Sequence, residues 1–141
     1  MGAIDLGDLP NEALLLMDSA PIIYFLEGHP KWKQRFLPLF EAHAARRLRF
    51  AVTTITVAEV LAGPLRTNDE LLVRRYRAIL DSWQPIDLDV DIAESAARLR
   101  TSLRLKLADA VQVASALAVN AAALVTHDRD FSRVHSLRII S

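Results

Sequence analysis

The sequence predicts an α/β fold with three layers, α/β/α, around a mostly parallel central sheet of about five strands. Short, nearly continuous apolar runs alternate with stretches at helical spacing, the pattern of a sheet covered by helices on both faces. Apolar residues make up 52% of the 141 residues and charged residues 24%, which suits one compact core. No repeat, low-complexity tract or linker divides the chain, so we expect residues 1–141 to form a single domain.

The predicted strands are short and rich in aliphatic side chains. They follow an irregular lead-in, residues 1–12, that is polar and contains Gly and Pro. Proline at the start of the third run predicts a short or edge strand there. The five runs are 13–17, 48–54, 85–88, 122–126 and 137–140.

Helical spacing marks the stretches between these runs. In the first stretch Pro38 is expected to interrupt the helix. The second should begin at Asn68 or Asp69, residue types that cap helices, and its apolar rhythm includes Leu71 and Ile79. The last is apolar nearly all round, as in a helix buried at the centre of a domain. The four predicted helices are 31–45, 68–80, 91–103 and 108–119.

Composition excludes several classes of protein. There is no cysteine, which rules out disulfides, thiolate nucleophiles and cysteine-bound zinc. The 17 basic and 17 acidic side chains cancel, which neither indicates nor excludes a nucleic-acid ligand because local patches matter more. The start of the chain lacks the pattern of a signal peptide, and no apolar run approaches the ~20 residues that span a bilayer. We expect a soluble, cytoplasmic protein without a membrane partner.

Three of four notable acidic residues fall where a parallel sheet builds its binding sites, near the carboxyl ends of strands, and the sequence does not place the fourth, Asp109, relative to the strands. Asp18 follows the first run, Glu59 lies one helical turn past the second, and Asp128 follows the fourth. Asp109 opens the apolar helix, where a buried, unpaired charge would cost several kcal/mol. A divalent cation shared with other carboxylates would offset that cost, and hard oxygen ligands favour Mg²⁺ or Mn²⁺.

Each acid also has a purely structural interpretation, because acidic side chains cap helices and turns. These interpretations are a helix cap at Asp18 or Ser19, a capping box at Thr56–Glu59, a weaker one at Asp109–Gln112, and an Asx-turn at Asp128.

Four segments resemble, in order, the motifs of PIN-domain proteins. The first is LMDSAPIIYFLE at 16–27, and the second is TITVAEVLAGP at 54–64. The third is LKLADAVQVASA at 105–116, and the fourth is VTHDRDF at 125–131. The resemblance runs from about residue 14 to residue 140, and the chain is similar to the VapC toxins of toxin–antitoxin pairs.

This resemblance implies a Mg²⁺- or Mn²⁺-dependent endoribonuclease that cleaves structured RNA, such as transfer or ribosomal RNA. It also implies homodimerisation and inhibition by a VapB-type antitoxin. The alternative is a catalytically inactive PIN module that only binds protein or RNA. The implied catalytic residues are Asp18, Glu59, Asp109 and Asp128, with Asp18, Asp109 and Asp128 on the metal, Asp130 as an accessory acid, and Ser19 and Thr126 as supporting hydroxyls.

Two positions depart from the family pattern. His127 stands where family members usually carry Asn, and it could donate a hydrogen bond, carry a proton or be inert. Ala108 stands where they commonly carry Pro.

Arg104 and Lys106 lead into Asp109, and they are the expected RNA phosphate contacts.

Aromatic residues recur at helix-like intervals near the first motif. We expect them to pack in the core, and a groove for an antitoxin helix or a dimer partner is the alternative. They are Tyr24, Phe25, Trp32, Phe36 and Phe40.

Overall fold

The computed structural model describes residues 2–141 and contains one five-stranded sheet in the order β3-β2-β1-β4-β5. Every neighbouring pair of strands is parallel. The predicted sheet is therefore confirmed, with β3 at an edge as its proline suggested. The strands are β1 (Ala13–Met17), β2 (Leu48–Thr53), β3 (Gln84–Ile86), β4 (Ala123–Val125) and β5 (Ile139–Ile140).

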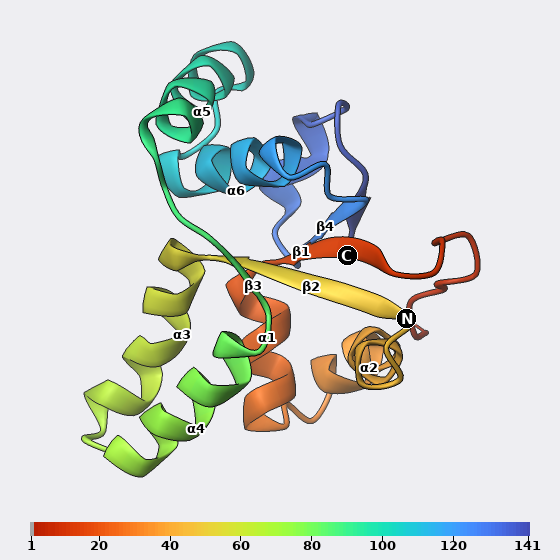
Figure 1. The fold of residues 1–141 in the computed structure, drawn as a ribbon, viewed down its shortest axis with the longest axis vertical. Helices are drawn as coiled ribbons and strands as arrows, with labels where there is room; N and C mark the ends of the chain where they lie inside the picture. Colours follow the sequence, from red (N-terminus) through yellow and green to blue (C-terminus); the bar gives the residue numbers. More distant parts are fainter. Residues whose placement is uncertain (1) are drawn as a thin grey trace.

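Helices cover both faces of this sheet (Figure 1), which confirms the three layers. Four pack on one face, and α5, α6 and a short 3₁₀ helix pack on the other. Within residues 2–141 no helix is both long and apolar enough to cross a membrane. The helices are α1 (Ser19–Glu27), α2 (Trp32–Ala44), α3 (Thr54–Arg66), α4 (Glu70–Asp81), α5 (Val90–Leu103), α6 (Leu107–Ala118) and η1 (Arg129–Arg133).

The central strand explains the continuous apolar runs. In β1, Leu15 and Met17 enter one core, and Leu14 and Leu16 enter the other. All five residues of the strand are buried, because alternate side chains point to opposite faces and both faces are covered. Residues 110–116 of α6 are also all buried, as its apolar circumference predicted.

One prediction about an individual helix is wrong. Helix α2 continues through Pro38, because the neighbouring Phe36 and Leu39 anchor it in the core and outweigh the lost backbone hydrogen bond.

The predicted apolar rhythm of α4, which Asp69 caps as predicted, is confirmed for only part of its positions. Tyr76 is buried and Leu72 packs against the core, whereas Leu71 and Ile79 are 61% and 38% exposed. Helix α4 packs mainly on α3, away from the sheet, so only one side of it is covered (Figure 1).

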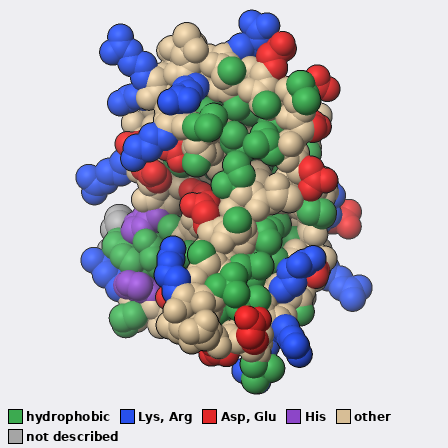
Figure 2. Space-filling model, turned by 90° about the vertical axis from the view of Figure 1, so that its left-hand side faces the viewer, with side chains coloured by type: hydrophobic (Ala, Val, Ile, Leu, Met, Phe, Trp, Pro, Cys, Tyr) green, Lys and Arg blue, Asp and Glu red, His purple; other side chains and the backbone are tan. Residues whose placement is uncertain are grey.

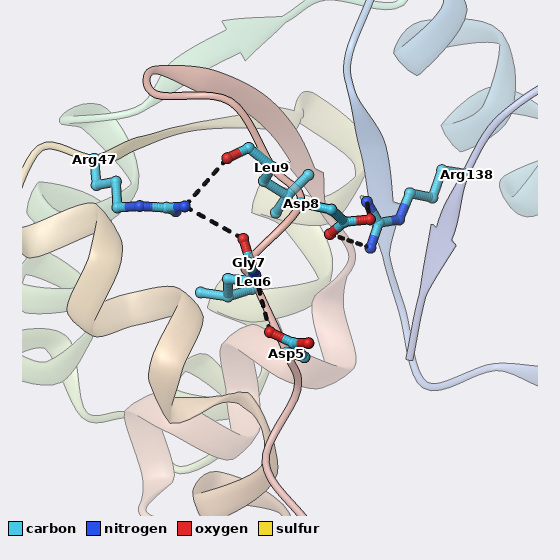
Figure 3. Close-up of polar contacts among 7 residues, drawn as sticks. All are labelled: Asp5, Leu6, Gly7, Asp8, Leu9, Arg47 and Arg138. Atoms are coloured by element: carbon cyan, nitrogen blue, oxygen red, sulfur yellow. Dashed lines mark hydrogen bonds and ion pairs between the residues drawn. The ribbon is translucent and has the colours of Figure 1, made fainter.

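The lead-in is irregular, as predicted, and basic side chains hold it against the sheet (Figure 3). The Arg47 guanidinium donates hydrogen bonds to the carbonyls of Leu6 (3.3 Å) and Leu9 (3.1 Å). Arg138 forms an ion pair with Asp8 at 2.9 Å. Both arginines directly precede strands, so the lead-in packs at the amino ends of the strands and leaves the carboxyl ends open.

The strand order creates a switch point beside β1. The chain moves from β1 to β2 and β3 on one side, and β4 and β5 lie on the other. Met17 pairs with Val125, so β1 and β4 end at the same level. Ligands of open parallel sheets bind in the crevice at such a point.

Candidate active site

The four predicted catalytic acids converge at this switch point. Asp18, Glu59, Asp109 and Asp128 line one cavity of about 570 Å³. Figure 2 looks onto this end of the sheet and shows acidic side chains near its middle, with Lys and Arg side chains around them. A cavity of the same volume lies at the amino ends of β1 and β2, but Glu12 is the one carboxylate that lines it. The concentration of negative charge marks the first cavity as the candidate site.

Asp18 is held by three hydrogen bonds. Its Oδ1 accepts from the backbone N–H of Ser19 at 2.9 Å and from Nε2 of Gln112 at 3.1 Å. Its Oδ2 accepts from the Thr126 hydroxyl at 2.8 Å. Asp18 is also the N-cap of α1, which confirms its structural interpretation and leaves it free to line the cavity. Ser19 assists through its main-chain N–H, whereas a hydroxyl bond was expected.

Gln112 is a site residue that sequence reasoning missed. Besides bonding Asp18, its amide donates to the Thr56 hydroxyl at 2.9 Å and accepts from the Thr53 hydroxyl at 2.6 Å. All three of these polar side chains are buried. The network ties the end of β2 and the start of α3 to α6 and orients Asp18. The signal in the sequence was a polar residue in the middle of an apolar helix.

Glu59 does not form the predicted capping box with Thr56. The N-cap of α3 is Thr53, whose hydroxyl accepts from the backbone N–H of Thr56 at 3.2 Å. Glu59 is an exposed residue whose carboxylate faces the cavity. Its partial burial, followed by the charges of Asp18 and Asp109, raises its pKa.

Asp109 is the most perturbed acid of the site. It lies in the first turn of α6, where the N-cap is Lys106, and Gln112 turns to Asp18 instead of completing a capping box. Among the described residues, no hydrogen-bond partner reaches its buried Oδ2. Burial is the largest influence on its pKa, followed by the charge of Asp128, and together with the other nearby acids they raise it to about 6.

Asp128 forms the predicted Asx-turn, with its Oδ1 accepting from the backbone N–H of Asp130 at 2.9 Å. The Thr126 hydroxyl accepts from the backbone N–H of Asp128 at 3.1 Å, so one hydroxyl links Asp18 to Asp128. Asp109, Asp128 and Asp130 each offer a carboxylate oxygen, and these oxygens all lie within 4.8 Å of one another. This group includes the accessory acid Asp130 where Asp18 was expected.

The donor set fits a hard divalent cation. The compact group of Asp109, Asp128 and Asp130 offers only carboxylate oxygens, the ligand type that Mg²⁺ and Mn²⁺ prefer. Asp109 supplies a buried oxygen without a hydrogen-bond partner, the kind of atom that a cation would satisfy.

Basic residues border the acids. Lys106 lies 3.7 Å from Asp130 and is exposed, as is Arg104, which ends α5 in a left-handed conformation with φ of 56°. Arg129 lines the cavity and was not predicted. These positive charges can attract an anionic ligand that the carboxylates alone would repel.

The aromatic residues divide into two groups. Phe36 and Phe40 are buried in the core, as predicted. Tyr24, Phe25 and Trp32 are only half-buried. His127 also lines the cavity, and its Nδ1 lies 2.9 Å from the Tyr24 hydroxyl.

Comparison with known proteins agrees with this geometry. A toxin–antitoxin complex from Klebsiella pneumoniae has a chain that is 27% identical, with a TM-score of 0.72 over 90% of this chain and 96% of that one. VapBC2 from Rickettsia felis, bound to promoter DNA, is 22% identical, with a TM-score of 0.71 over 89% and 96%. VapC20 from Mycobacterium tuberculosis, described as a sarcin–ricin loop cleaving toxin, is 14% identical, with a TM-score of 0.66 over 90% and 99%.

None of the curated proteins matches the chain. The last two structural similarities show the fold alone, because their identities are low. A family model for the PIN domain, however, matches residues 15–137, which is most of the sequence. The chain therefore belongs to the PIN domain family.

Proposed function

We propose that this PIN domain is a VapC-like toxin that cleaves structured RNA with the help of Mg²⁺ or Mn²⁺. The observation that carries the proposal is the partly buried carboxylate of Asp109. This carboxylate has a buried oxygen without a partner among the described residues, and burial together with the neighbouring acids raises the pKa of Asp109 to about 6. A protein that kept these acids for folding alone would place each one beside a donor, because unpaired buried charge is destabilising.

The proposed ligand residues are Asp18, Asp109 and Asp128, with Asp130 completing the compact group and Glu59 lining the same cavity. When bound, the metal would activate a water molecule and stabilise charge on the scissile phosphate. The protein's own contribution is positioning. Hydrogen bonds from Gln112 and Thr126 keep both oxygens of Asp18 in place before any ligand arrives.

The basic border supports an RNA substrate. Lys106 and Arg104 are proposed to contact phosphates flanking the cut, and Arg129 joins them from the cavity wall. The similarity to VapC20, a toxin described as cleaving the sarcin–ricin loop, supports structured RNA as the substrate class, in transfer or ribosomal RNA. A substrate of this kind is consistent with a cytoplasmic protein.

The remaining partners are proposed from the relatives. A VapB-type antitoxin is the expected inhibitor, because the similar structures include toxin–antitoxin complexes. A homodimer is the expected assembly. Exposed leucines offer apolar surface for such contacts, among them Leu65 (47%), Leu107 (56%) and Leu117 (39%).

Incubating the purified protein with transfer RNA and with ribosomal RNA, in EDTA and in Mn²⁺, tests the proposal. We expect the parent protein to cut the RNA at discrete sites in Mn²⁺ and not in EDTA. The Asp18→Asn and Asp109→Asn variants should not cut it in either condition. Circular dichroism should show that both variants remain folded. Equal cleavage in EDTA, or full activity in either variant, would refute the assignment.

A further inference from the structure

Three aromatic rings pack together beside the acidic cavity, and we call them the aromatic wall: Tyr24, Trp32 and His127. The ring centroids of Trp32 and His127 lie 4.2 Å apart, and those of Tyr24 and His127 lie 5.5 Å apart. The Tyr24 hydroxyl and His127 Nδ1 are joined by a hydrogen bond of 2.9 Å. The wall joins residues far apart in the sequence into one surface.

The wall is supported from the core and stays partly exposed. Phe36, which is completely buried, packs against both Tyr24 and His127, with ring centroids 6.1 and 5.8 Å away. The three rings themselves are only half-buried. Core packing alone does not require this arrangement, because an aromatic ring kept partly in water gives up some of the free energy of burial.

Tyr24 and His127 line the same cavity as the catalytic acids. Figure 2 shows histidine and hydrophobic side chains together on one side of the acidic centre. A polymer held with one phosphate at the acids would therefore pass its neighbouring residue over these rings.

The charges on this side favour a polyanion. The Lys31 Nζ lies 4.5 Å from the centroid of the Trp32 ring. Arg129 lines the cavity next to His127. These cations adjoin the wall, so a phosphate group can approach from this side despite the carboxylates.

We propose that the aromatic wall is a stacking subsite for one unpaired nucleobase of the RNA, adjacent to the scissile phosphate. The inference rests on the proposed ribonuclease function and adds how the substrate is placed. Aromatic side chains stack with any base, so the subsite selects an unpaired nucleotide rather than a sequence. Paired bases in a helix do not offer their faces, so a loop or bulge is the expected target.

Tryptophan fluorescence tests the proposal directly, because the chain has two tryptophans. Trp32 belongs to the wall, whereas Trp83 is 6% exposed and packs against Phe50. In an Asp109→Asn background, where RNA should stay intact, we expect a single-stranded oligoribonucleotide to quench the fluorescence of Trp32. This quenching should persist in the Trp83→Phe variant and disappear in the Trp32→Phe variant.

Binding of the same oligonucleotide gives the magnitude. Stacking on one aromatic residue corresponds to roughly 5- to 100-fold in affinity, so Trp32→Ala should weaken binding by about that factor. The Trp32→Phe variant, which keeps an aromatic ring, should retain most of the affinity that Trp32→Ala loses. Replacing the stacked nucleotide by an abasic residue should weaken binding to the parent protein and have little further effect on Trp32→Ala.

Quenching by single-stranded RNA but not by a duplex of the same sequence would support the subsite. Unquenched Trp32 with bound RNA, or quenching by a cognate antitoxin and not by RNA, would overturn it. This readout needs no cleavage, so it separates the two proposals. An active nuclease without quenching refutes the subsite alone, and quenching without metal-dependent cleavage refutes the nuclease alone.

Discussion

Replacing Asp109 by asparagine should stabilise the metal-free protein at neutral pH. The amide has nearly the same shape as the carboxylate but cannot ionise. In the folded protein, burial and the charges of Asp128, Asp18 and Asp130 raise the pKa of Asp109 from its ordinary value of 3.8 to about 6. Folding therefore opposes ionisation of this side chain, and asparagine removes that opposition.

The sign and size follow from linkage. The folded state binds the Asp109 proton more tightly than the unfolded state does. The protonated side chain therefore contributes to the stability of the fold, and this contribution is fully present below the unfolded pKa. It is lost as the pH rises through the folded pKa, between about pH 4 and about pH 6. A shift of about two pKa units corresponds to at most ~3 kcal/mol. Solvent screening at this half-buried group reduces the expected gain to about 1–2 kcal/mol.

Urea unfolding in EDTA measures the effect. At about pH 7.5 the Asp109→Asn variant should be more stable than the parent by about 1–2 kcal/mol, and at about pH 4 the difference should nearly vanish. Asp87→Asn is the control, because Asp87 is exposed and outside the acidic cavity. A difference that does not depend on pH, or a variant less stable than the parent at about pH 7.5, would contradict the reasoning.

Three further predictions concern the residues around the acids. Gln112→Leu removes the buried amide that bonds Thr53, Thr56 and Asp18, although the two threonines still bond each other and Asp18 still bonds Thr126. Urea unfolding should therefore show a loss of about 1–3 kcal/mol. Ser115→Ala, which removes a buried hydroxyl without a partner, should cost far less, and equal losses would argue against the network. Thr126→Val removes the hydroxyl shared by Asp18 and Asp128, and RNA cleavage rates should fall by roughly 10- to 100-fold. Unchanged rates would show that Asp18 is positioned without it. Replacing Arg104 and Lys106 by alanine should reduce the slope of log affinity for RNA against log salt by about 1 to 2, and an unchanged slope would exclude both as phosphate contacts.

The sheet could be predicted because burial on both faces imposes a local pattern. Leu14 to Met17 is apolar at every position, and Asp18 marks the end of the strand. The errors in the helices arose where packing overrides local preference. Pro38 is tolerated because its neighbours are buried, and Leu71 is exposed because the sheet does not reach that side of α4.

The acids of the site could be named in advance because each belongs to a motif, and because Asp18 directly follows β1 and Asp128 comes shortly after β4. Their partners could not. Gln112 was not foreseen, and Thr126 was expected to support only its own motif. Both bond Asp18, across separations of 94 and 108 residues, which no local spacing encodes. Local spacing instead suggested a capping box at Asp109, which the tertiary network displaced. Asp130 was placed among the accessory acids, and the turn at Asp128 brings it into the compact group.

The central claim is that these separate carboxylates meet to hold a divalent cation. Anomalous diffraction from crystals grown with Mn²⁺ tests it most directly. We expect a manganese peak in contact with Asp109 and Asp128, and its loss in the Asp109→Asn variant. Strong peaks only at other surfaces, with these carboxylates free of metal, would contradict the account.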